Sequence, residues 1–329
     1  MEYAWLRQRI LSADLRENFG EVALDVFRYQ AEHNRLYREF LRLLSVAPER
    51  VGDWTDVPCL PVSFFKTHLL QTGGWSPAMV FRSSGTTGMP SSMHLVRQPD
   101  WYLLHARRGF ERLYGPLAGR CVLALLPAYL EREGSSLVYM AEDFVRASGR
   151  PESGFFLRDH DRLLEVLARC RAEGVPTLLL GVSFALLELA ERADAPDLSW
   201  AIVMETGGMK GRRREMTRME LHAYLCERFR CGAIHSEYGM TELFSQAYAP
   251  AGGLFEPAPT LRALSRDPYD PLQRQPAGRV GGLNLIDLAN LDTCSFLATD
   301  DLGRVYDDDR FEVLGRFDAA DLRGCNLLV

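Results

Sequence analysis

Hydrophobic and polar positions follow a helical spacing at the beginning of the chain. Over residues 3–45 the apolar side chains recur every three or four positions, as on one face of an amphipathic helix. Polar residues around Asn34 interrupt this pattern. The segment is therefore predicted to form two or three helices, with these apolar positions facing a core: Leu6, Ile10, Leu11, Leu15, Phe19, Val22, Leu24, Phe27, Tyr37, Phe40, Leu41 and Leu44.

Farther along the chain, short apolar runs alternate with longer stretches at helical spacing. Strands that alternate with helices in this way are typical of α/β folds with largely parallel sheets. The strands are predicted at 119–126, 177–180, 201–205 and 232–236, and the helices at 99–113, 134–147, 159–173, 183–193 and 213–229.

The C-terminal third has a different pattern. Pro, Gly and Arg are frequent over residues 250–281, and no periodicity is visible there, which predicts loops and edge strands of a small β region. Short strands are predicted at 283–288, 295–298 and 311–318. The expected architecture is α/β, with a large domain of mostly parallel sheets flanked by helices and this small β region beside it.

Composition narrows the classes of function. The net charge of −6 argues against a nucleic-acid partner recruited by bulk electrostatics. Seven cysteines, an odd number without a Cys-x-x-Cys pair, indicate reduced thiols rather than a zinc site or a disulfide framework. No signal peptide and no apolar run of about 18 residues is visible, so a cytoplasmic chain without a membrane span is expected.

The segment from Phe81 to Ser92 carries the strongest chemical signal. Here Ser84, Gly85, Thr86, Thr87 and Gly88 follow a short apolar run, and Pro90 ends the series. Backbone N–H groups and hydroxyls in such a loop can surround a polyphosphate, because glycine lets the backbone curl around an anion. A flexible linker has the same composition. The loop is not a Walker motif, because the Gly-Lys-Ser/Thr ending is missing.

Two further motifs decide between these interpretations. Residues 237–242 read Glu-Tyr-Gly-Met-Thr-Glu, about 150 residues after the first loop, and residues 298–303 read Ala-Thr-Asp-Asp-Leu-Gly. Together with the loop they resemble the core motifs of the acyl-adenylate-forming superfamily, which includes acyl- and aryl-CoA ligases, adenylation domains and luciferase-like enzymes. The resemblance implies ATP and Mg²⁺ as cofactors and a carboxylic acid as substrate.

The resemblance also implies roles for individual residues. Ser83 to Gly88 would bind the β- and γ-phosphates, Thr241 a phosphate, and Glu242 the Mg²⁺ ion. Tyr238, with Gly239 after it, would pack on adenine, and the backbone of Gly207 and Gly208 would line the same base. Asp300 would bind the ribose hydroxyls, with Asp301 as the competing candidate one position later. Arg316, in Gly-Arg-Phe-Asp, would contact the ribose.

The sequence departs from the superfamily in two places. The loop ends Pro90-Ser91-Ser92 where the superfamily usually has Pro-Lys-Gly, so its lysine is missing, and Lys210 is the proposed substitute. The mobile domain that usually follows the Gly-Arg-x-Asp element, with its catalytic lysine, is also not seen. The predicted division is therefore an N-terminal helical segment at 1–55, an adenylate-forming core at 56–315, and a hinge-like tail at 316–329.

Within the superfamily the chain looks most similar to the acyl-protein synthetases of bacterial bioluminescence operons (LuxE-like), which are related to phenylacetate-CoA ligases. Those proteins lack the mobile domain and carry an acyl-accepting cysteine near the C-terminus. Cys325 matches that cysteine, and Arg323 nearby would favour its thiolate. A buried, inert thiol is the structural alternative. The similar segments are 60–66, 84–88, 126–132, 238–242 and 321–327.

The sequence therefore predicts an ATP-dependent ligase that activates a carboxylic acid as acyl-AMP and transfers it to Cys325 as a thioester. The acid is expected to be a fatty acid, with an aryl acid as the alternative. An acyl reductase or a carrier protein is the partner that the family implies. One alternative is a ligase that hands the acyl group to CoA or to a carrier-protein thiol. Another is a nonenzymatic nucleotide-binding subunit of a reductase complex.

Overall fold

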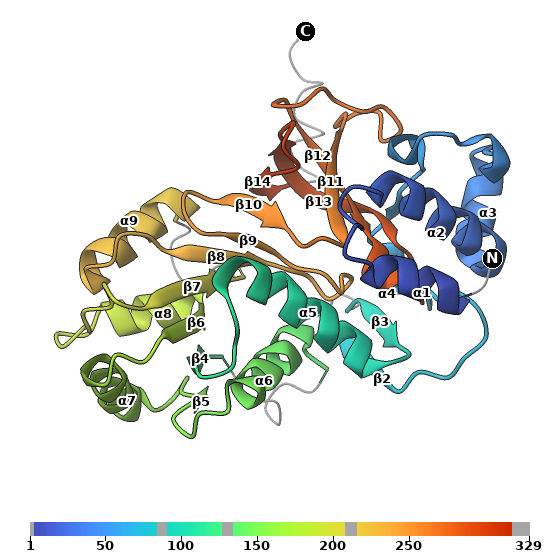
Figure 1. The fold of residues 1–329 in the computed structure, drawn as a ribbon. Helices are drawn as coiled ribbons and strands as arrows, with labels where there is room; N and C mark the ends of the chain where they lie inside the picture. The colour runs from blue at the N-terminus through green and yellow to red at the C-terminus, as the bar shows by residue number, and fades with distance from the viewer. Residues whose placement is uncertain (1–2, 84–90, 127–133, 208–215, 318–329) are drawn as a thin grey trace, which may run out of the picture.

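One large sheet forms the centre of the protein (Figure 1). The computed structural model describes residues 3–83, 91–126, 134–207 and 216–317. Among them the sheet has twelve strands, in the order β11-β12-β13-β14-β10-β9-β8-β7-β6-β4-β5, with β1 (Leu60–Pro61) paired to β13. This mixed sheet with helices around it confirms the α/β class, and a separate hairpin of β2 (Met79–Arg82) and β3 (Met93–Val96) stands beside it.

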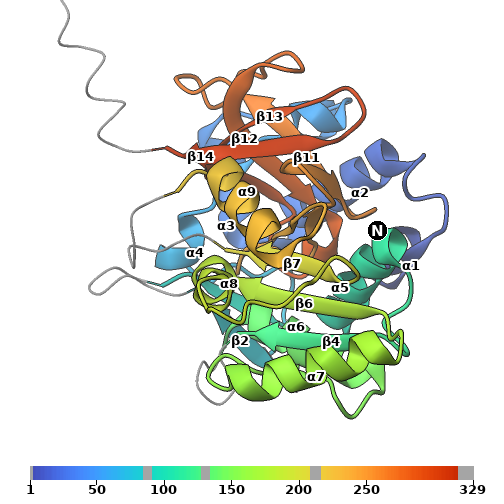
Figure 2. The same ribbon diagram turned by 90° about the vertical axis from the view of Figure 1, so that its left-hand side faces the viewer.

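One part of the sheet is parallel and has helices on both faces. Alternate residues of β4 belong to two different cores: Val122 and Ala124 pack toward α5 and α6, and Leu123 and Leu125 toward α7, α8 and α9. Figure 2 shows the second group of helices along these strands. The elements of this part are β4 (Cys121–Leu125), β5 (Gly154–Phe155), β6 (Thr177–Val182), β7 (Ile202–Thr206), β8 (His235–Tyr238), α5 (Pro99–Tyr114), α6 (Ser136–Ser148), α7 (His160–Ala172), α8 (Ser183–Ala190) and α9 (Arg218–Phe229).

The other part of the sheet is antiparallel. It contains β9 (Ala247–Ala249), β10 (Leu254–Pro257), β11 (Leu261–Arg266), β12 (Val280–Asp287), β13 (Phe296–Val305) and β14 (Phe311–Arg316). The strands from residues 250–281 extend the large sheet instead of forming a region of their own, since β10 pairs with β9 and β14. β13 lies between β12 and β14, so the motif at 298–303 stands in the middle of the antiparallel strands.

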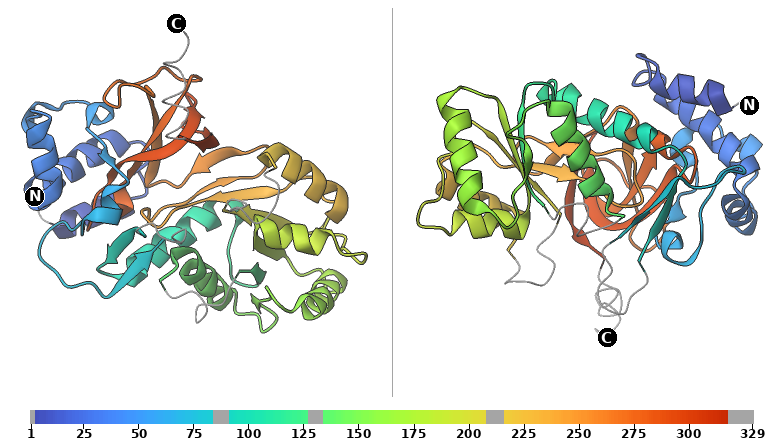
Figure 3. Two further views of the ribbon diagram at one scale, coloured as in Figure 1. Left: turned by 180° about the vertical axis from the view of Figure 1, so that it is seen from behind. Right: turned by 90° about the horizontal axis from the view of Figure 1, so that it is seen from below.

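The predicted N-terminal helices exist and cover β12 and β13. Figure 3 shows them beside these strands, at the opposite end of the molecule from α7. Phe27 and Tyr37 both pack on Phe296 of β13, with ring centroids 5.8 and 6.2 Å apart. The remaining helical elements are α1 (Tyr3–Leu11), α2 (Phe19–His33), α3 (Arg35–Leu43), α4 (Phe64–Thr67) and the short 3-10 turns Pro48–Arg50, Trp54–Asp56 and Leu288–Asn290.

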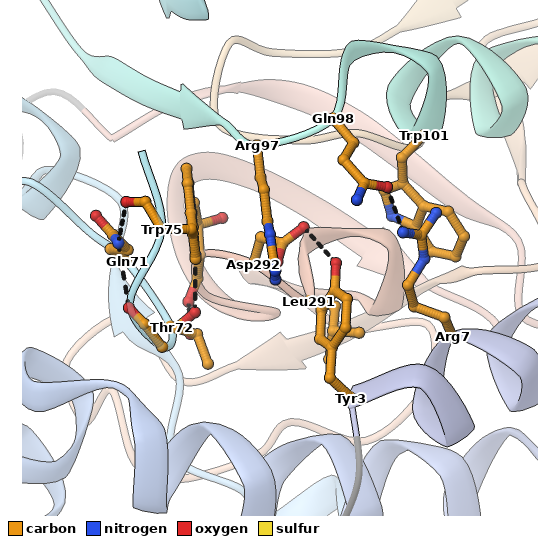
Figure 4. A network of polar contacts seen from close by, with 12 residues as sticks. Tyr3, Arg7, Gln71, Thr72, Trp75, Arg97, Gln98, Trp101, Leu291 and Asp292 are labelled. Carbon is orange, nitrogen blue, oxygen red and sulfur yellow. Dashed lines mark hydrogen bonds and ion pairs between the residues drawn. The ribbon is translucent and has the colours of Figure 1, made fainter. Parts of the chain in front are cut away.

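A polar network fastens α1 to the sheet (Figure 4). The Tyr3 hydroxyl donates to Asp292 Oδ2 at 3.0 Å, and Arg97 Nη1 pairs with Asp292 Oδ1 at 3.1 Å. Arg7 donates to Gln98 and lies over the Trp101 ring at 4.2 Å. These contacts join the first helix to the segment after β3 and to the turn before β13. Among the described residues, no helix is both long enough and apolar enough to cross a bilayer.

Candidate active site

Three residues from separate motifs, on β8, β13 and β14, contact one another through their side chains. The Tyr238 hydroxyl donates to Asp301 Oδ2 at 2.7 Å, and Arg316 Nε donates to Asp301 Oδ1 at 3.2 Å. The Asp301 side chain is 7% exposed, whereas that of Arg316 is 75% exposed. A carboxylate held at both oxygens therefore lies beside an accessible guanidinium group.

The structure separates the two neighbouring aspartates of this motif. Asp301 is buried and contacts both Tyr238 and Arg316, whereas Asp300 is exposed. Successive side chains of a strand point to opposite faces, so a shift of one residue exchanges the faces. The sequence prediction chose Asp300, but the geometry favours Asp301, the competing candidate, as the carboxylate that belongs to this site.

Tyr238 has a structural role in the chain as described. Its ring packs against Phe255 and Phe311, with centroids 5.7 and 5.6 Å away, and the residue is 9% exposed. Burial raises the pKa of Tyr238 well above its usual range, so the hydroxyl remains a donor to Asp301. Only a small part of the ring can contact a purine without movement, and its contact with adenine stays a prediction.

A buried histidine supports the turn that contains Thr241. His94 Nδ1 lies 2.9 Å from the Thr241 carbonyl oxygen, and Nε2 lies 2.9 Å from the Thr293 hydroxyl. Burial lowers the pKa of His94 to about 4, so the ring is neutral at pH 7. Because a carbonyl only accepts, Nδ1 carries the hydrogen and Nε2 accepts from Thr293. His94 thus fixes the main chain directly before Glu242.

Glu242 is a buried carboxylate surrounded by polar groups. It is 7% exposed, and its carbonyl oxygen accepts from Asn290 Nδ2 at 2.7 Å. Burial raises the pKa of Glu242, and the Ser92 hydroxyl, Lys66 and Arg316 lower it in turn. The charges of Lys66 and Arg316 thus lower the pKa of this carboxylate, and Arg316 also donates to Asp301.

The two residues that flank the predicted phosphate loop, Ser83 and Ser92, are hydrogen-bonded to each other, and Ser92 lies near Glu242. Ser83 N donates to Ser92 O at 3.1 Å, and Ser92 N donates to Ser83 Oγ at 2.8 Å, which closes the β2–β3 hairpin. The buried Ser92 hydroxyl lowers the pKa of Glu242 and so lies near that carboxylate, although it forms no hydrogen bond of normal geometry among the described residues. Ser92, which follows the predicted phosphate loop, thus lies near the second motif. Several predicted site residues lie outside the described residues: Ser84, Gly85, Thr86, Thr87, Gly88, Gly208, Lys210 and Cys325.

Two of the predicted glycines occupy positions where a side chain is disfavoured. Gly207 follows β7 with a φ of +71°, and its carbonyl accepts from Ser183 Oγ at 2.8 Å. At Gly239 an added Cβ would collide with the Glu237 carboxylate. The main chain therefore carries no side chain at Gly207, after β7, and at Gly239, after β8.

Lys66 is a functional candidate that the sequence analysis missed. It is partly buried on α4, and its charge acts on Glu242. Phe65 brings this helix into place by packing on His94 at 5.2 Å. A signal was present in the sequence, because only two of the 38 lysine and arginine residues are lysines, Lys66 and Lys210.

The donor set fits a phosphate-bound Mg²⁺ ion better than a metal site made of protein ligands alone. Among the residues described, no three His, Cys, Asp or Glu side chains come together as a metal site. Mg²⁺ that is bound with nucleotides commonly takes one or two carboxylates and completes its shell with phosphates and water. Glu242, buried beside the Ser92 hydroxyl, is the carboxylate that could serve.

Comparisons with known proteins agree on the fold. No protein-family model and no curated protein matches the chain. ATP-bound MatB from Rhodopseudomonas palustris matches with a TM-score of 0.55 and 18% identity, over 74% of this chain and 49% of that one. An open 2-hydroxyisobutyryl-CoA ligase in complex with 2-HIB-AMP and CoA matches with a TM-score of 0.63 and 15% identity, over 91% of this chain and 70% of the ligase.

The chain thus spans about half the length of MatB. The chain has the fold of both matched structures. At 18% and 15% identity these likenesses show the fold alone.

Proposed function

We propose that this protein is an ATP-dependent ligase that activates a carboxylic acid as acyl-AMP and transfers the acyl group to a thiol. The convergence of the three motifs carries the proposal: Asp301 and Arg316, Thr241 and Glu242, and the root of the Ser/Gly/Thr loop lie around one region. The matched structures add support, since one contains ATP and another an acyl-adenylate with CoA.

The nucleoside end of ATP would lie at the C-terminal ends of β7 and β8, near Asp301 of β13. Asp301 would accept hydrogen bonds from the ribose hydroxyls, for which its fixed carboxylate is suited. Arg316 holds Asp301 in place and can also contact the ribose. The bare backbone at Gly207 and Gly208 would pack against the adenine, with Tyr238 at the base of the site.

The phosphates would lie between the Ser/Gly/Thr loop and Glu242. Backbone N–H groups of residues 84–88 and the Thr241 hydroxyl would donate to phosphate oxygens. Mg²⁺, held by Glu242 when bound, neutralises charge on the phosphates. Lys66 would provide the cation that the loop lacks, in addition to the sequence candidate Lys210.

In the reaction, a carboxylate oxygen of the acid attacks the α-phosphorus. The new P–O bond forms as the bond to the bridging oxygen breaks, and the electron pair leaves with pyrophosphate. Two anions must approach each other for this to happen. The site therefore has to hold the carboxylate and the α-phosphate in line and neutralise their charge. Lys66 and Arg316 would provide the positive charge.

The acceptor thiol is proposed to be Cys325, as in acyl-protein synthetases. A thiolate is needed for the attack on the acyl-AMP carbonyl, which releases AMP. Burial raises the pKa of the thiols of Cys59, Cys121 and Cys294 to about 12 and that of Cys231 to about 11, so these four are protonated at pH 7. They are therefore poor acceptors. The fatty acid and the reductase or carrier partner follow from the family resemblance and remain predictions.

Intact-protein mass spectrometry tests this function. After incubation with ATP, Mg²⁺ and a panel of fatty, aryl and amino acids, we expect an acyl mass gain that hydroxylamine removes and that Cys325→Ser lacks. Pyrophosphate release without an adduct, and with turnover restored by CoA, would move the acceptor to an external thiol. No pyrophosphate release with any acid would contradict the adenylation itself.

A matched pair of variants tests the ribose contact. Asp301→Asn is expected to raise the KM for ATP in pyrophosphate exchange by about 10²-fold, because a charged hydrogen-bond acceptor for two hydroxyls is lost. Asp300→Asn, one residue away on the other face, should change it less than about 3-fold. A larger effect at Asp300 would restore the assignment made from the sequence.

A further inference from the structure

A group of buried polar side chains lies behind Gly239, on the face of the sheet covered by α5. Glu237 of β8 is paired with Thr206 of β7 on one side and with Tyr248 of β9 on the other. Paired residues of neighbouring strands share a face. A Cβ placed on Gly239 would meet both the Glu237 carboxylate and the Gln246 side chain, so these two side chains lie next to that glycine. We call Glu237, Gln246 and Tyr248 the Glu237 cluster.

Two side chains of the Glu237 cluster have a polar atom that is not satisfied within the described part of the chain. Glu237, Gln246 and Tyr248 are 7%, 3% and 2% exposed. Gln246 Oε1 and the Tyr248 hydroxyl have no hydrogen-bond partner there. Glu237 accepts from the Thr206 hydroxyl but has no ion pair with a Lys, Arg or His among the described residues. Buried polar groups normally have partners, so two unpaired acceptors near a buried carboxylate without a cationic partner indicate a ligand.

The pKa of Glu237 shows the effect of burial without a compensating cation among the described residues. Burial raises the pKa of Glu237 to about 7, and the neighbouring Glu205 raises it further, while the Thr206 hydroxyl lowers it. By contrast, Glu205 on the opposite face lies 3.4 Å from Arg218 Nε and 3.6 Å from His222 Nε2. Of two buried glutamates on adjacent strands, one has cationic partners within the described chain and the other does not.

The position of the cluster fits the acid substrate. The reacting carboxylate must reach the α-phosphate near Thr241, and the Glu237 carboxylate lies at Gly239, two residues before it. Two residues of chain span at most roughly 7 Å, and the turn at Thr241 shortens this distance. A group on the acid that reaches the cluster is therefore only a few bonds from the reacting carboxylate.

We propose that the acid substrate carries an ammonium group close to its carboxylate, as an amino acid does, and that the Glu237 cluster binds this group. An ammonium has three N–H donors and no acceptor, which matches the Glu237 carboxylate, Gln246 Oε1 and the Tyr248 hydroxyl oxygen. It also provides the positive charge that Glu237 lacks. This inference rests on the proposed adenylation and replaces the fatty acid expected from the family resemblance.

Paired acyl-AMP mimics test the inference without catalysis. Leucyl-, phenylalanyl- and β-alanyl-sulfamoyl-adenosine are titrated by calorimetry beside their desamino counterparts. We expect the amino member of at least one pair to bind about 10²-fold tighter or more, because a site built for donors rejects an analogue that lacks them. In Glu237→Gln that ratio should fall toward one. The matched control Glu205→Gln, on the other face of the next strand, should keep it.

The outcomes separate this inference from the proposed function. Equal or tighter binding of the desamino members would overturn the ammonium site and leave adenylation in place. Binding of neither member of any pair would count against the adenylate site itself, and against the inference with it. A melting temperature for Glu237→Gln at or above that of the parent protein would show that a changed ratio does not come from unfolding.

Discussion

Glu242→Gln is expected to lower acid-dependent pyrophosphate exchange by about 10³-fold while the fold persists. The carboxylate is the only acidic ligand proposed for Mg²⁺ in this site, and the loss of one electrostatic contact to a transition state commonly costs 10²–10³-fold. The amide keeps the shape of the side chain but provides no charge for the metal. The measurement is ATP–pyrophosphate exchange with the best acid of the panel.

The stability of this variant provides a second readout. Burial raises the pKa of Glu242 from 4.5, so the folded protein binds a proton more tightly than the unfolded chain. Stability from this group is present below pH 4.5 and is lost as the pH rises through the folded pKa. Glu242→Gln removes the ionisable group and with it this loss of stability at high pH. The melting temperature of the variant should therefore equal or exceed that of the parent at pH 8. Glu227→Gln, on the exposed face of α9, is the control for a neutralised glutamate.

Lys66→Met is expected to lower kcat/KM for ATP in the same assay by about 10²-fold. Lys66 lies on α4 and acts on the Glu242 carboxylate, where the phosphates are proposed to bind. Removal of a cation there leaves developing negative charge unbalanced. Lys66→Arg should recover part of the activity, because it keeps the charge but changes the geometry of the donors.

Lys210→Met distinguishes the two lysines of the chain. If Lys66 is the phosphate cation, Lys66→Met should have the larger effect on the KM for ATP. The opposite order would return this role to Lys210, as the sequence analysis proposed. Equal melting temperatures of the Met and Arg variants at position 66 would exclude a purely structural cause.

The fold class could be predicted from the sequence because its signals are local. The strand at 121–125 is apolar at every position, as a strand buried on both faces must be, and amphipathic helices flank it.

Residues 250–281 gave no such signal. Arg262 and Arg266 of β11 are buried there, with their guanidinium groups donating to backbone carbonyls of Leu261, Leu283 and Thr299. A sequence pattern counts these arginines as exposed.

The candidate site divides in the same way. The sequence by itself determined the motifs, because the residue types and their order in the chain carry the resemblance at Ser84 to Gly88, at Thr241 and Glu242, and at Arg316. It could not choose between Asp300 and Asp301, since that choice depends on which face of β13 is buried. It also could not bring Lys66 within electrostatic range of Glu242, or Gln246 and Tyr248 near Glu237. Those neighbourhoods arise only when β1, β8, β9 and β13 pair in one sheet, so only the tertiary structure decided them.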